Sequence, residues 1–273
     1  MPGTRYQLGR EIGRGASSVV YDAEHVDLGR RVALKVLAAG SAEYAERVRS
    51  EARALERLSH PGLTRVHDFG VASDGRCYSA MELLEGETLE GYLARLGGCD
   101  WREALGVADK MLAALEAAHA AGLVHRDIKP ANVFLTLGGE VKLLDFGIAR
   151  GAAEAGATSE AVGAATVDGV TLFGTPEYMA PEQAASGQVD HRADIYALGC
   201  VLYEMLTGRI PFAEGSAVAI LDAKTKGSPE RPRDRAPSRG IPDPVDELVM
   251  RALARHPTVR FQSATEMRTA LFA

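Results

Sequence analysis

The hydrophobic periodicity of this 273-residue chain changes near residue 84, and this change limits the fold more than any other feature. Before it, apolar residues alternate as in β-strands; in RVALKVL, residues 31–37, successive side chains point to opposite sides. One segment, 42–58, interrupts this region with apolar positions at helical spacing. Later apolar residues recur at helical spacing in segments beginning near Trp101, Ile195, Pro244 and Ala264. The sequence therefore predicts an α+β chain, mostly β over 1–84 and mostly α over 85–273.

The run HRDIKPAN, residues 125–132, concentrates polar chemistry between two apolar segments. It places a carboxylate (Asp127), an ammonium (Lys129) and an amide (Asn132) within six residues. A proton acceptor, a cation for phosphate and a metal ligand side by side are what phosphoryl transfer to a hydroxyl requires. The alternative interpretation is a polar turn without a catalytic role. A phosphotransfer loop also needs groups that bind phosphate and metal elsewhere in the chain, and their presence would distinguish the two interpretations.

A glycine-rich segment precedes the clearest strand by about twenty residues: GRGASSVVY contains Gly13 and Gly15. Such a hairpin lets backbone N–H groups approach phosphates, although an ordinary turn would use the same glycines. Lys35 lies in the strand, and Glu51 falls within the apolar stripe of 42–58. Because a carboxylate directed at a core is costly unless paired, we expect Glu51 to pair with Lys35 and fix the ammonium over phosphates.

The segment LLDFGIAR ends an apolar strand at Asp145, just before Phe146 and Gly147. A carboxylate at a strand end beside a glycine can reach a bound cation. Together with Asn132 it would supply the hard oxygen ligands that Mg²⁺ prefers, with phosphate and water at the remaining positions. The spacing of thirteen residues between Asn132 and Asp145 favours this interpretation over a simple turn.

Three further predictions concern the segment GTPEYMAPEQ, residues 174–183, and the helix after it. Thr175 is expected to hydrogen-bond the loop at 125–132. Glu182 and the distant Arg260 are candidates for a buried ion pair. Asp194, at the start of an apolar helix, either accepts N–H groups of the 125–132 loop or caps its own helix.

With these elements in this order, residues 6–271 resemble the eukaryotic-type protein kinases, and most closely the bacterial Ser/Thr kinases among them. The resemblance implies a bilobal α+β protein-kinase fold. Its small, mostly β N-lobe with one regulatory helix would be 1–84, its larger, mostly α C-lobe 85–273, and the two together one kinase domain. ATP would bind between the lobes with Mg²⁺, for which Mn²⁺ is a substitute. Lysine at position 129 and the run GTPEY are typical of the Ser/Thr class.

The resemblance also assigns roles to individual residues. Asp127 would be the catalytic base, and Lys129 would neutralise the γ-phosphate. The other implied catalytic residues are Lys35 and Glu51, and the implied metal ligands are Asn132 and Asp145. The implied nucleotide-binding residues, with Met81 as gatekeeper, are Ile12, Gly13, Gly15, Ser18, Val20, Ala33, Lys35, Met81, Glu82, Leu84 and Phe134. A regulatory spine would stack His125, Phe146, Leu55 and Val66.

One residue departs from the family pattern: Ser18 stands where a third glycine is expected. Serine restricts the loop but adds no negative charge, so it need not abolish nucleotide binding. Glu87 would contact the ribose or a basic substrate residue.

Regulation is predicted around Arg126, which precedes the catalytic aspartate. An arginine there needs a negative partner, and phosphorylation of the segment between Asp145 and Glu182 would supply one. Among the hydroxyl residues of this segment, we predict autophosphorylation of Thr166 or Thr171. Self-association would allow one copy to phosphorylate another.

Composition limits the partners and the compartment. The net charge is −6 and no basic stripe accompanies it, which argues against nucleic acid. Three cysteines without close pairing, no N-terminal apolar segment and no apolar run of about 18 residues favour the cytoplasm and predict no membrane segment. A domain cut from a longer protein would have the same composition and patterns.

Two other functions share much of this pattern. A kinase-fold scaffold without activity (a pseudokinase) usually has substitutions at Lys35, Asp127, Asn132 or Asp145, and none is present. A small-molecule phosphotransferase would lack the peptide-recognition run GTPEYMAPE. We therefore expect a protein kinase that transfers the γ-phosphoryl group of ATP to Ser/Thr hydroxyls of proteins.

Overall fold

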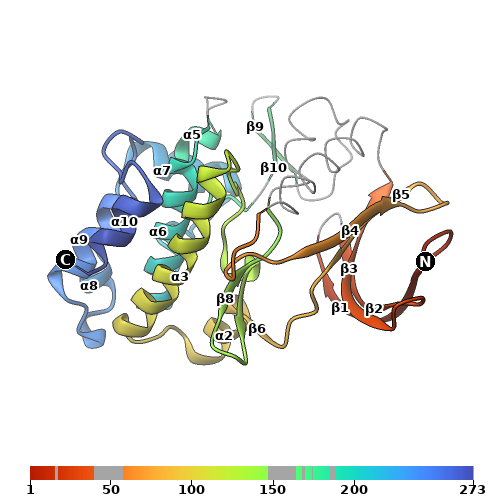
Figure 1. The fold of residues 1–273 in the computed structure, drawn as a ribbon. Coiled ribbons are helices and arrows are strands. Elements are labelled where there is room, and N and C mark those ends of the chain that lie inside the picture. Colours follow the sequence, from red (N-terminus) through yellow and green to blue (C-terminus); the bar gives the residue numbers. More distant parts are fainter. Residues whose placement is uncertain are drawn as a thin grey trace. The chain divides into compact units, whose positions relative to one another are not determined.

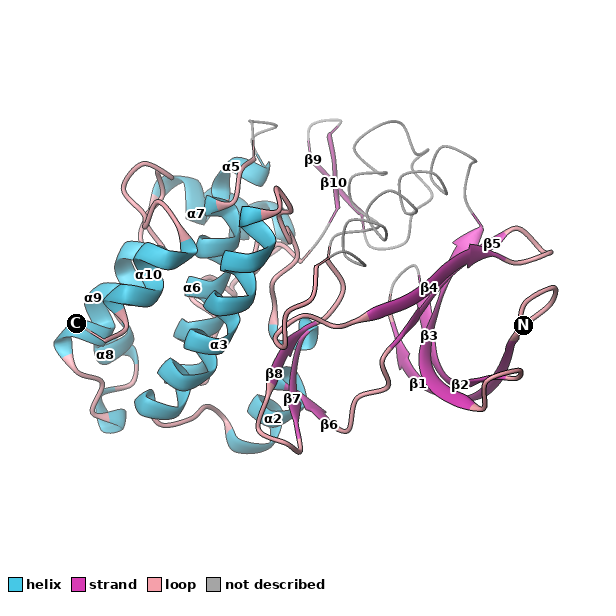
Figure 2. Ribbon diagram, in the orientation of Figure 1, coloured by secondary structure: helices cyan, strands magenta, loops and turns pink. Residues whose placement is uncertain are grey.

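The computed structural model describes residues 1–15, 18–39, 58–146, 164–167, 170–173, 175–184 and 189–272. These residues form two compact units. Unit 1 takes the described residues of 1–59 and 63–85 together with Ala164, and unit 2 takes those of 60–62, 86–147 and 165–272. Figure 1 and Figure 2 show strands in unit 1 and mainly helices in unit 2, as the change in periodicity predicts. The division at residue 84 stays a prediction.

Unit 1 is built on one antiparallel five-stranded sheet in the order β1-β2-β3-β5-β4. Its strands are β1 (Tyr6–Arg14), β2 (Ser18–His25), β3 (Arg30–Ala39), β4 (Val66–Val71) and β5 (Arg76–Met81). Short turns join β2 to β3 and β4 to β5, and the pairs β1–β2, β2–β3 and β4–β5 are neighbours both along the chain and in the sheet. The helix predicted at 42–58 lies outside the described residues, apart from its last position.

The two faces of β3 differ as its alternating sequence predicts. Val32, Leu34 and Val36 are buried and belong to one apolar cluster, which also contains Tyr6 and Tyr78. Since side chains alternate along a strand, Ala33 and Lys35 lie on the opposite face. Burial of the apolar face fixes the register, because a slip of one residue would bring Lys35 into the cluster.

Unit 2 is organised around two long helices, α3 (Trp101–Ala120) and α6 (Arg192–Thr207), which pack against each other. Among the residues of α6, only Arg192 and Glu204 are not buried, so the prediction of a helix surrounded by core is confirmed. The predicted closing helices are also present as α9 (Asp243–Ala252), which packs on α6, and α10 (Ala264–Ala270), which packs on α3. Figure 2 shows these four helices in cyan.

Smaller elements complete unit 2. A three-stranded sheet, β6-β7-β8, is formed by β6 (Gly86–Thr88), β7 (Val133–Thr136) and β8 (Val141–Leu143). Strand β9 (Ala164–Val167), whose first residue belongs to unit 1, pairs with β10 (Val170–Phe173). The short helices are α2 (Leu89–Leu96), η1 (Pro130–Asn132), α5 (Pro181–Ala184), α7 (Ala217–Lys226), α8 (Pro232–Arg235) and η2 (Pro237–Arg239). No helix in the described ranges is long and apolar enough to cross a membrane.

Candidate active site

The loop at 125–132 brings its three predicted functional side chains together. Asn132 Nδ2 donates to the carbonyl oxygen of Asp127 at 2.8 Å and to its carboxylate Oδ2 at 3.0 Å. Lys129 Nζ lies 3.4 Å from the same Oδ2. Pro130, at the first position of η1, starts the tight turn that returns Asn132 towards Asp127. The side chains of Asp127 and Lys129 keep 22% and 26% of their exposure, so a substrate can reach them.

Asp194 holds the start of this loop from inside unit 2. Its carboxylate is fully buried, and it accepts the backbone N–H groups of His125 and Arg126, each at 2.8 Å. His119 Nε2 lies 2.8 Å from the same carboxylate. Of the two roles predicted for Asp194, the structure shows the contact with the loop.

The backbone of Arg126 has a φ of 63°, in the left-handed region that non-glycine residues rarely adopt. Such a conformation costs free energy and persists only where surrounding contacts fix it. Two such contacts involve the backbone of Arg126. Its N–H donates to the Asp194 carboxylate, and its carbonyl accepts from Gln183 Nε2 at 3.3 Å. They turn the chain so that Asp127 follows in a fixed direction.

Asp145 is tied to the same loop through its neighbours. The N–H of Leu144 donates to the Asn132 carbonyl at 2.8 Å, and the Leu144 carbonyl lies 2.8 Å from His125 Nε2. The rings of His125 and Phe146 are 4.5 Å apart, which confirms this contact of the predicted spine. Leu55 lies outside the described residues, and Val66 belongs to unit 1. Asp145 itself has a φ of 51°, a second strained backbone beside the loop.

The residues around Asn132 and Asp145 fit a Mg²⁺ ion. Both hydrogen bonds of the Asn132 amide towards Asp127 use its nitrogen, so the amide oxygen is the atom suited to a cation. The Leu144 bond to Asn132 places the two candidate ligand residues on adjoining segments. An amide oxygen and a carboxylate are a donor set typical of Mg²⁺ bound together with phosphate.

Thr175 contacts the loop as predicted. Lys129 Nζ donates to Thr175 Oγ1 at 3.0 Å, so residues 175–180 begin beside the candidate catalytic groups. We call residues 175–180 the docking segment. Two side chains that the sequence analysis missed hold it: Glu204 accepts from Tyr178 Oη at 2.6 Å, and Gln183 Oε1 accepts from the N–H of Ala180 at 2.9 Å. The Tyr178–Glu204 contact joins residues 26 apart and needs the tertiary fold, whereas the Ala180–Gln183 contact is local: a glutamine at the third position of α5 reaches back to the N–H just before the helix.

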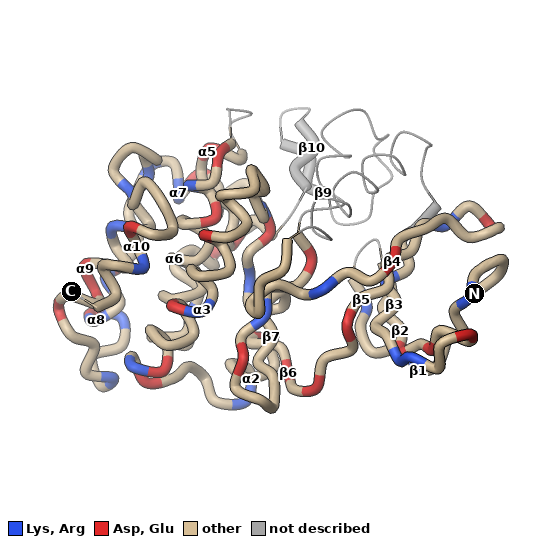
Figure 3. Tube along the Cα trace, viewed as in Figure 1, with Lys and Arg blue, Asp and Glu red and all other residues tan. Residues whose placement is uncertain are grey.

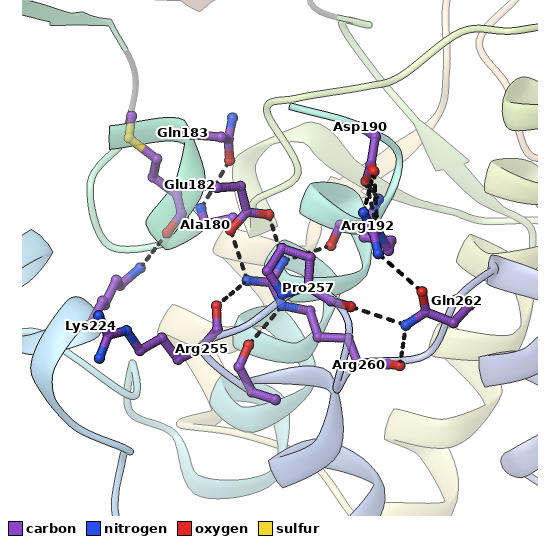
Figure 4. A network of polar contacts seen from close by, with 12 residues as sticks. Ala180, Glu182, Gln183, Asp190, Arg192, Lys224, Arg255, Pro257, Arg260 and Gln262 are labelled. Carbon is purple, nitrogen blue, oxygen red and sulfur yellow. Dashed lines mark hydrogen bonds and ion pairs between the residues drawn. The ribbon is translucent and has the colours of Figure 1, made fainter. Parts of the chain in front are cut away.

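The predicted ion pair between Glu182 and Arg260 is present and buried. Arg260 NH1 and NH2 donate to the two oxygens of Glu182 at 2.6 and 2.8 Å, in bidentate geometry. The arginine side chain is fully buried and also donates to the carbonyls of Ala254, Arg255 and Arg192 (Figure 4). The pair therefore joins α5, which directly follows the docking segment, to the loop before α10.

In unit 1, strand register aligns several predicted nucleotide-binding residues. Gly13 pairs with Val20, and Val20 with Lys35, so these positions lie side by side across β1, β2 and β3. Ala33, two residues from Lys35, pairs with Met81 on β5. Because directly paired residues share a face, Val20, Lys35, Ala33 and Met81 lie on one side of the sheet, opposite the apolar cluster.

The glycine-rich turn closes without the third glycine. The N–H of Gly15 donates to the carbonyl of Ser18 at 2.8 Å, and Ile12, at the end of β1, is exposed. A serine at position 18 is therefore compatible with the hairpin. Residues 16 and 17 lie outside the described residues.

Near the end of unit 1, the N–H of Glu82 donates to the carbonyl of Arg65 at 3.0 Å, and the Glu82 carboxylate accepts the N–H of Arg65 at 2.9 Å. Leu84 follows between β5 and β6, outside any helix or strand, and Phe134 lies on β7 of unit 2. Glu87, a candidate for ribose or substrate, instead accepts from Arg95 in the structure.

Several predicted residues cannot be placed. Glu51 lies outside the described residues, so its pairing with Lys35 stays a prediction. Thr166 and Thr171 belong to β9 and β10 by their backbone only. All three cysteines are buried.

The fold and the arrangement around Asp127 are those of a phosphotransfer domain, and a family model confirms this class. The model described as a protein kinase domain matches residues 6–272, and the chain belongs to that family. A probable serine/threonine-protein kinase of Streptomyces coelicolor is 41% identical over 272 residues. The serine/threonine-protein kinases PknL and PknA of Mycobacterium tuberculosis are 41% and 39% identical over 268 and 276 residues.

These alignments cover nearly all of this chain but only part of each relative. They include 97%, 97% and 98% of the chain, and 39%, 64% and 61% of the three relatives in the same order. The chain thus spans less than two thirds of the length of each of these relatives.

Proposed function

We propose that this chain is a serine/threonine protein kinase domain that transfers the γ-phosphoryl group of ATP to Ser/Thr hydroxyls of proteins. The observation that carries the proposal is the contact of Lys129 with both Asp127 and Thr175. It places a carboxylate base and a phosphate-binding ammonium at the start of the docking segment. The names of the bacterial relatives support the same activity.

In the proposed reaction, Asp127 accepts the proton of the acceptor hydroxyl as that oxygen bonds to the γ-phosphorus of ATP, and the bond from this phosphorus to the β–γ bridging oxygen breaks, which releases ADP. Lys129 neutralises charge on the transferred group and, through Thr175, keeps the docking segment beside it. Asn132 and Asp145 would hold Mg²⁺, which stabilises negative charge on the phosphates when bound. Asn132 also orients the Asp127 carboxylate through the bond from Nδ2.

The face of the unit 1 sheet opposite its apolar cluster supports a role in nucleotide binding. We propose that Lys35 contacts the α- and β-phosphates and that Glu51 fixes its ammonium. The turn at Gly13 and Gly15 would present N–H groups to phosphate. Adenine would contact Ile12, Val20, Ala33, Met81, Glu82, Leu84 and Phe134, with Ser18 at the edge of the turn.

The two alternative functions have less support. Only Ser18 favours the pseudokinase alternative. The hydrogen bond between Gly15 and Ser18 forms with serine at this position, so this support is weak. A small-molecule phosphotransferase would have no use for the docking segment, which contacts of Lys129, Glu204 and Gln183 hold in place. Protein substrates are therefore the proposed acceptors.

The proposal extends to partners and location. Acidic and basic residues are interspersed along the trace of each unit (Figure 3), which supports protein rather than nucleic-acid partners. Self-association would permit phosphorylation in trans at Thr166 or Thr171, with Arg126 binding the phosphate. Three buried cysteine thiols support a reducing cytoplasm.

The test is incubation with ATP, Mg²⁺ and a protein that offers Ser, Thr and Tyr, followed by phosphoamino-acid analysis. The proposal predicts phosphoserine and phosphothreonine. Phosphotyrosine alone would contradict the acceptor class, and transfer to small molecules but not to protein would favour the phosphotransferase alternative.

A further inference from the structure

A buried lysine on α7, remote in sequence from every catalytic motif, holds the backbone of the docking segment. Lys224 is 1% exposed, and its Nζ donates to the carbonyl oxygens of Pro176, Glu177 and Met179 at 2.9, 2.6 and 2.9 Å. The ammonium thus uses its three donors on three carbonyls of one short stretch. Figure 4 shows Lys224 directed towards this stretch from its helix.

The residues that surround Lys224 on the buried face of α7 are apolar. Lys224 shares the buried face of α7 with Ile220 and Leu221, four and three residues earlier, and Leu221 packs on Met179. An apolar side chain would fill such a position without the cost of burying a charge. Burial lowers the pKa of Lys224, which reflects that cost.

The site around the ammonium offsets part of this cost. The three carbonyl dipoles point at Nζ, and the ring of Tyr196 lies 5.3 Å away, within range of a cation–π contact. Three carbonyls from neighbouring residues converge on one point only when the chain curls around a donor. The conformation of residues 176–179 therefore depends on Lys224.

We infer that Lys224 is a positioning residue for the protein acceptor: it fixes residues 176–179 in the conformation that brings the acceptor hydroxyl to Asp127. This inference rests on the proposed kinase function. Thr175, the residue just before the stretch, contacts Lys129 beside Asp127, so a shift of residues 176–179 moves the surface next to the reacting groups. A displacement of about 1 Å in such a segment can cost about 100-fold in rate.

The experiment compares Lys224→Met with the wild type and with Lys226→Met. Lys226 lies two residues further on the same helix, is exposed and pairs with Asp222, so the control makes the same substitution outside the docking segment. Myelin basic protein serves as acceptor, and the KM for acceptor, the KM for ATP and the acceptor-independent hydrolysis of ATP are measured. Melting temperatures and hydrogen exchange of the amides at 177–180 are recorded for each variant.

Lys224→Met is expected to lower kcat/KM for the acceptor by about 10- to 100-fold and to speed exchange in the docking segment. Its KM for ATP and its ATP hydrolysis should stay within about twofold of wild type, as should all values of Lys226→Met. A general loss of folding would lower ATP hydrolysis together with kcat/KM for the acceptor, so it would not produce this difference between the two activities. Unchanged acceptor kinetics, or a parallel loss of ATP hydrolysis, would overturn the inference.

If Lys224→Met does not unfold cooperatively, Lys224→Gln takes its place, because a neutral amide can still donate to two carbonyls. The same difference between the two activities is expected, with a smaller loss. Failure of both variants to fold would also overturn the inference, since Lys224 would then serve the fold rather than the acceptor. A wild-type protein that transfers no phosphate to any protein would instead refute the proposed function itself.

Discussion

The carboxylate of Asp194 accepts the backbone N–H of Arg126 at 2.8 Å, and Arg126 is one of the two non-glycine residues with positive φ among those the structure describes. The second carboxylate oxygen accepts the N–H of His125. A buried acid in the first turn of α6 thus fixes a strained residue directly before Asp127. The strain is maintained by hydrogen bonds from within unit 2, and the catalytic loop depends on it.

Replacing Asp194 by asparagine should therefore damage both stability and activity. One acceptor oxygen becomes an NH₂ group that faces a backbone N–H, which leaves a buried donor unsatisfied and costs about 1–3 kcal/mol of unfolding free energy. Urea denaturation measures this loss, and phosphate transfer should fall with it. The control Asp222→Asn, at an exposed pair with Lys226, should cost at most about 0.5 kcal/mol. Equal stability of Asp194→Asn and wild type would contradict this role.

Substitution of one partner in the Glu182–Arg260 ion pair should lower the free energy of unfolding more than substitution in most other ion pairs of the protein. Arg260→Met leaves the Glu182 carboxylate without its bidentate partner and should lower the unfolding free energy by about 3–5 kcal/mol. Adding Glu182→Met should recover part of this loss, because the unpaired charge is then gone. Denaturation of the single and double variants tests both steps; a double variant less stable than the single one would show that the charge is not the cause.

Glu204 gives a pH dependence with a defined sign. Burial raises the pKa of Glu204 above the ordinary 4.5, partly opposed by the hydrogen bond from Tyr178 and assisted by Glu90. The folded protein then binds more protons than the unfolded chain between the two pKa values, so stability falls as the pH rises through this window. Glutamine does not titrate, so Glu204→Gln should gain melting temperature relative to wild type as the pH rises above the ordinary pKa of 4.5. The exposed Glu247→Gln is the control, and a constant difference across this range would contradict the prediction.

Regulation by phosphorylation makes a separate prediction. Incubation with ATP and Mg²⁺ should add phosphate to the segment between Asp145 and Glu182, at Thr166 or Thr171, and Thr→Ala at the modified position should lower activity. Arg126→Ala should remove the benefit of the phosphate, because the negative group then has no partner. Intact-mass measurement of an active, wholly unmodified protein would rule this regulation out.

Local sequence patterns predicted the parts of the site that depend on spacing within one segment. The alternation of β3 predicted which face carries Lys35, and HRDIKPAN predicted the grouping of Asp127, Lys129 and Asn132. The pair of Glu182 and Arg260, 78 residues apart, was also predicted from the sequence. The three bonds of Lys224 were not, because a lysine near a helix C-terminus usually faces water, and only the path of a distant segment buries it.

The contact of Glu87 with Arg95, eight residues away, was not predicted either, and the predicted role of Glu87 towards ribose or substrate stays a prediction. An acidic residue near a binding region and one in an ordinary surface pair have the same local surroundings. The contact depends on how β6 leads into α2, which the composition does not specify.

The most direct test of the account is phosphate transfer from ATP–Mg²⁺ to a generic protein substrate by the wild type and by Asp127→Asn. Asparagine keeps the size of the side chain but cannot accept the hydroxyl proton as a carboxylate does, so transfer should fall by at least about 100-fold while the melting temperature stays near that of wild type. Equal phosphate transfer by the two proteins would contradict the assignment of Asp127 as the catalytic base.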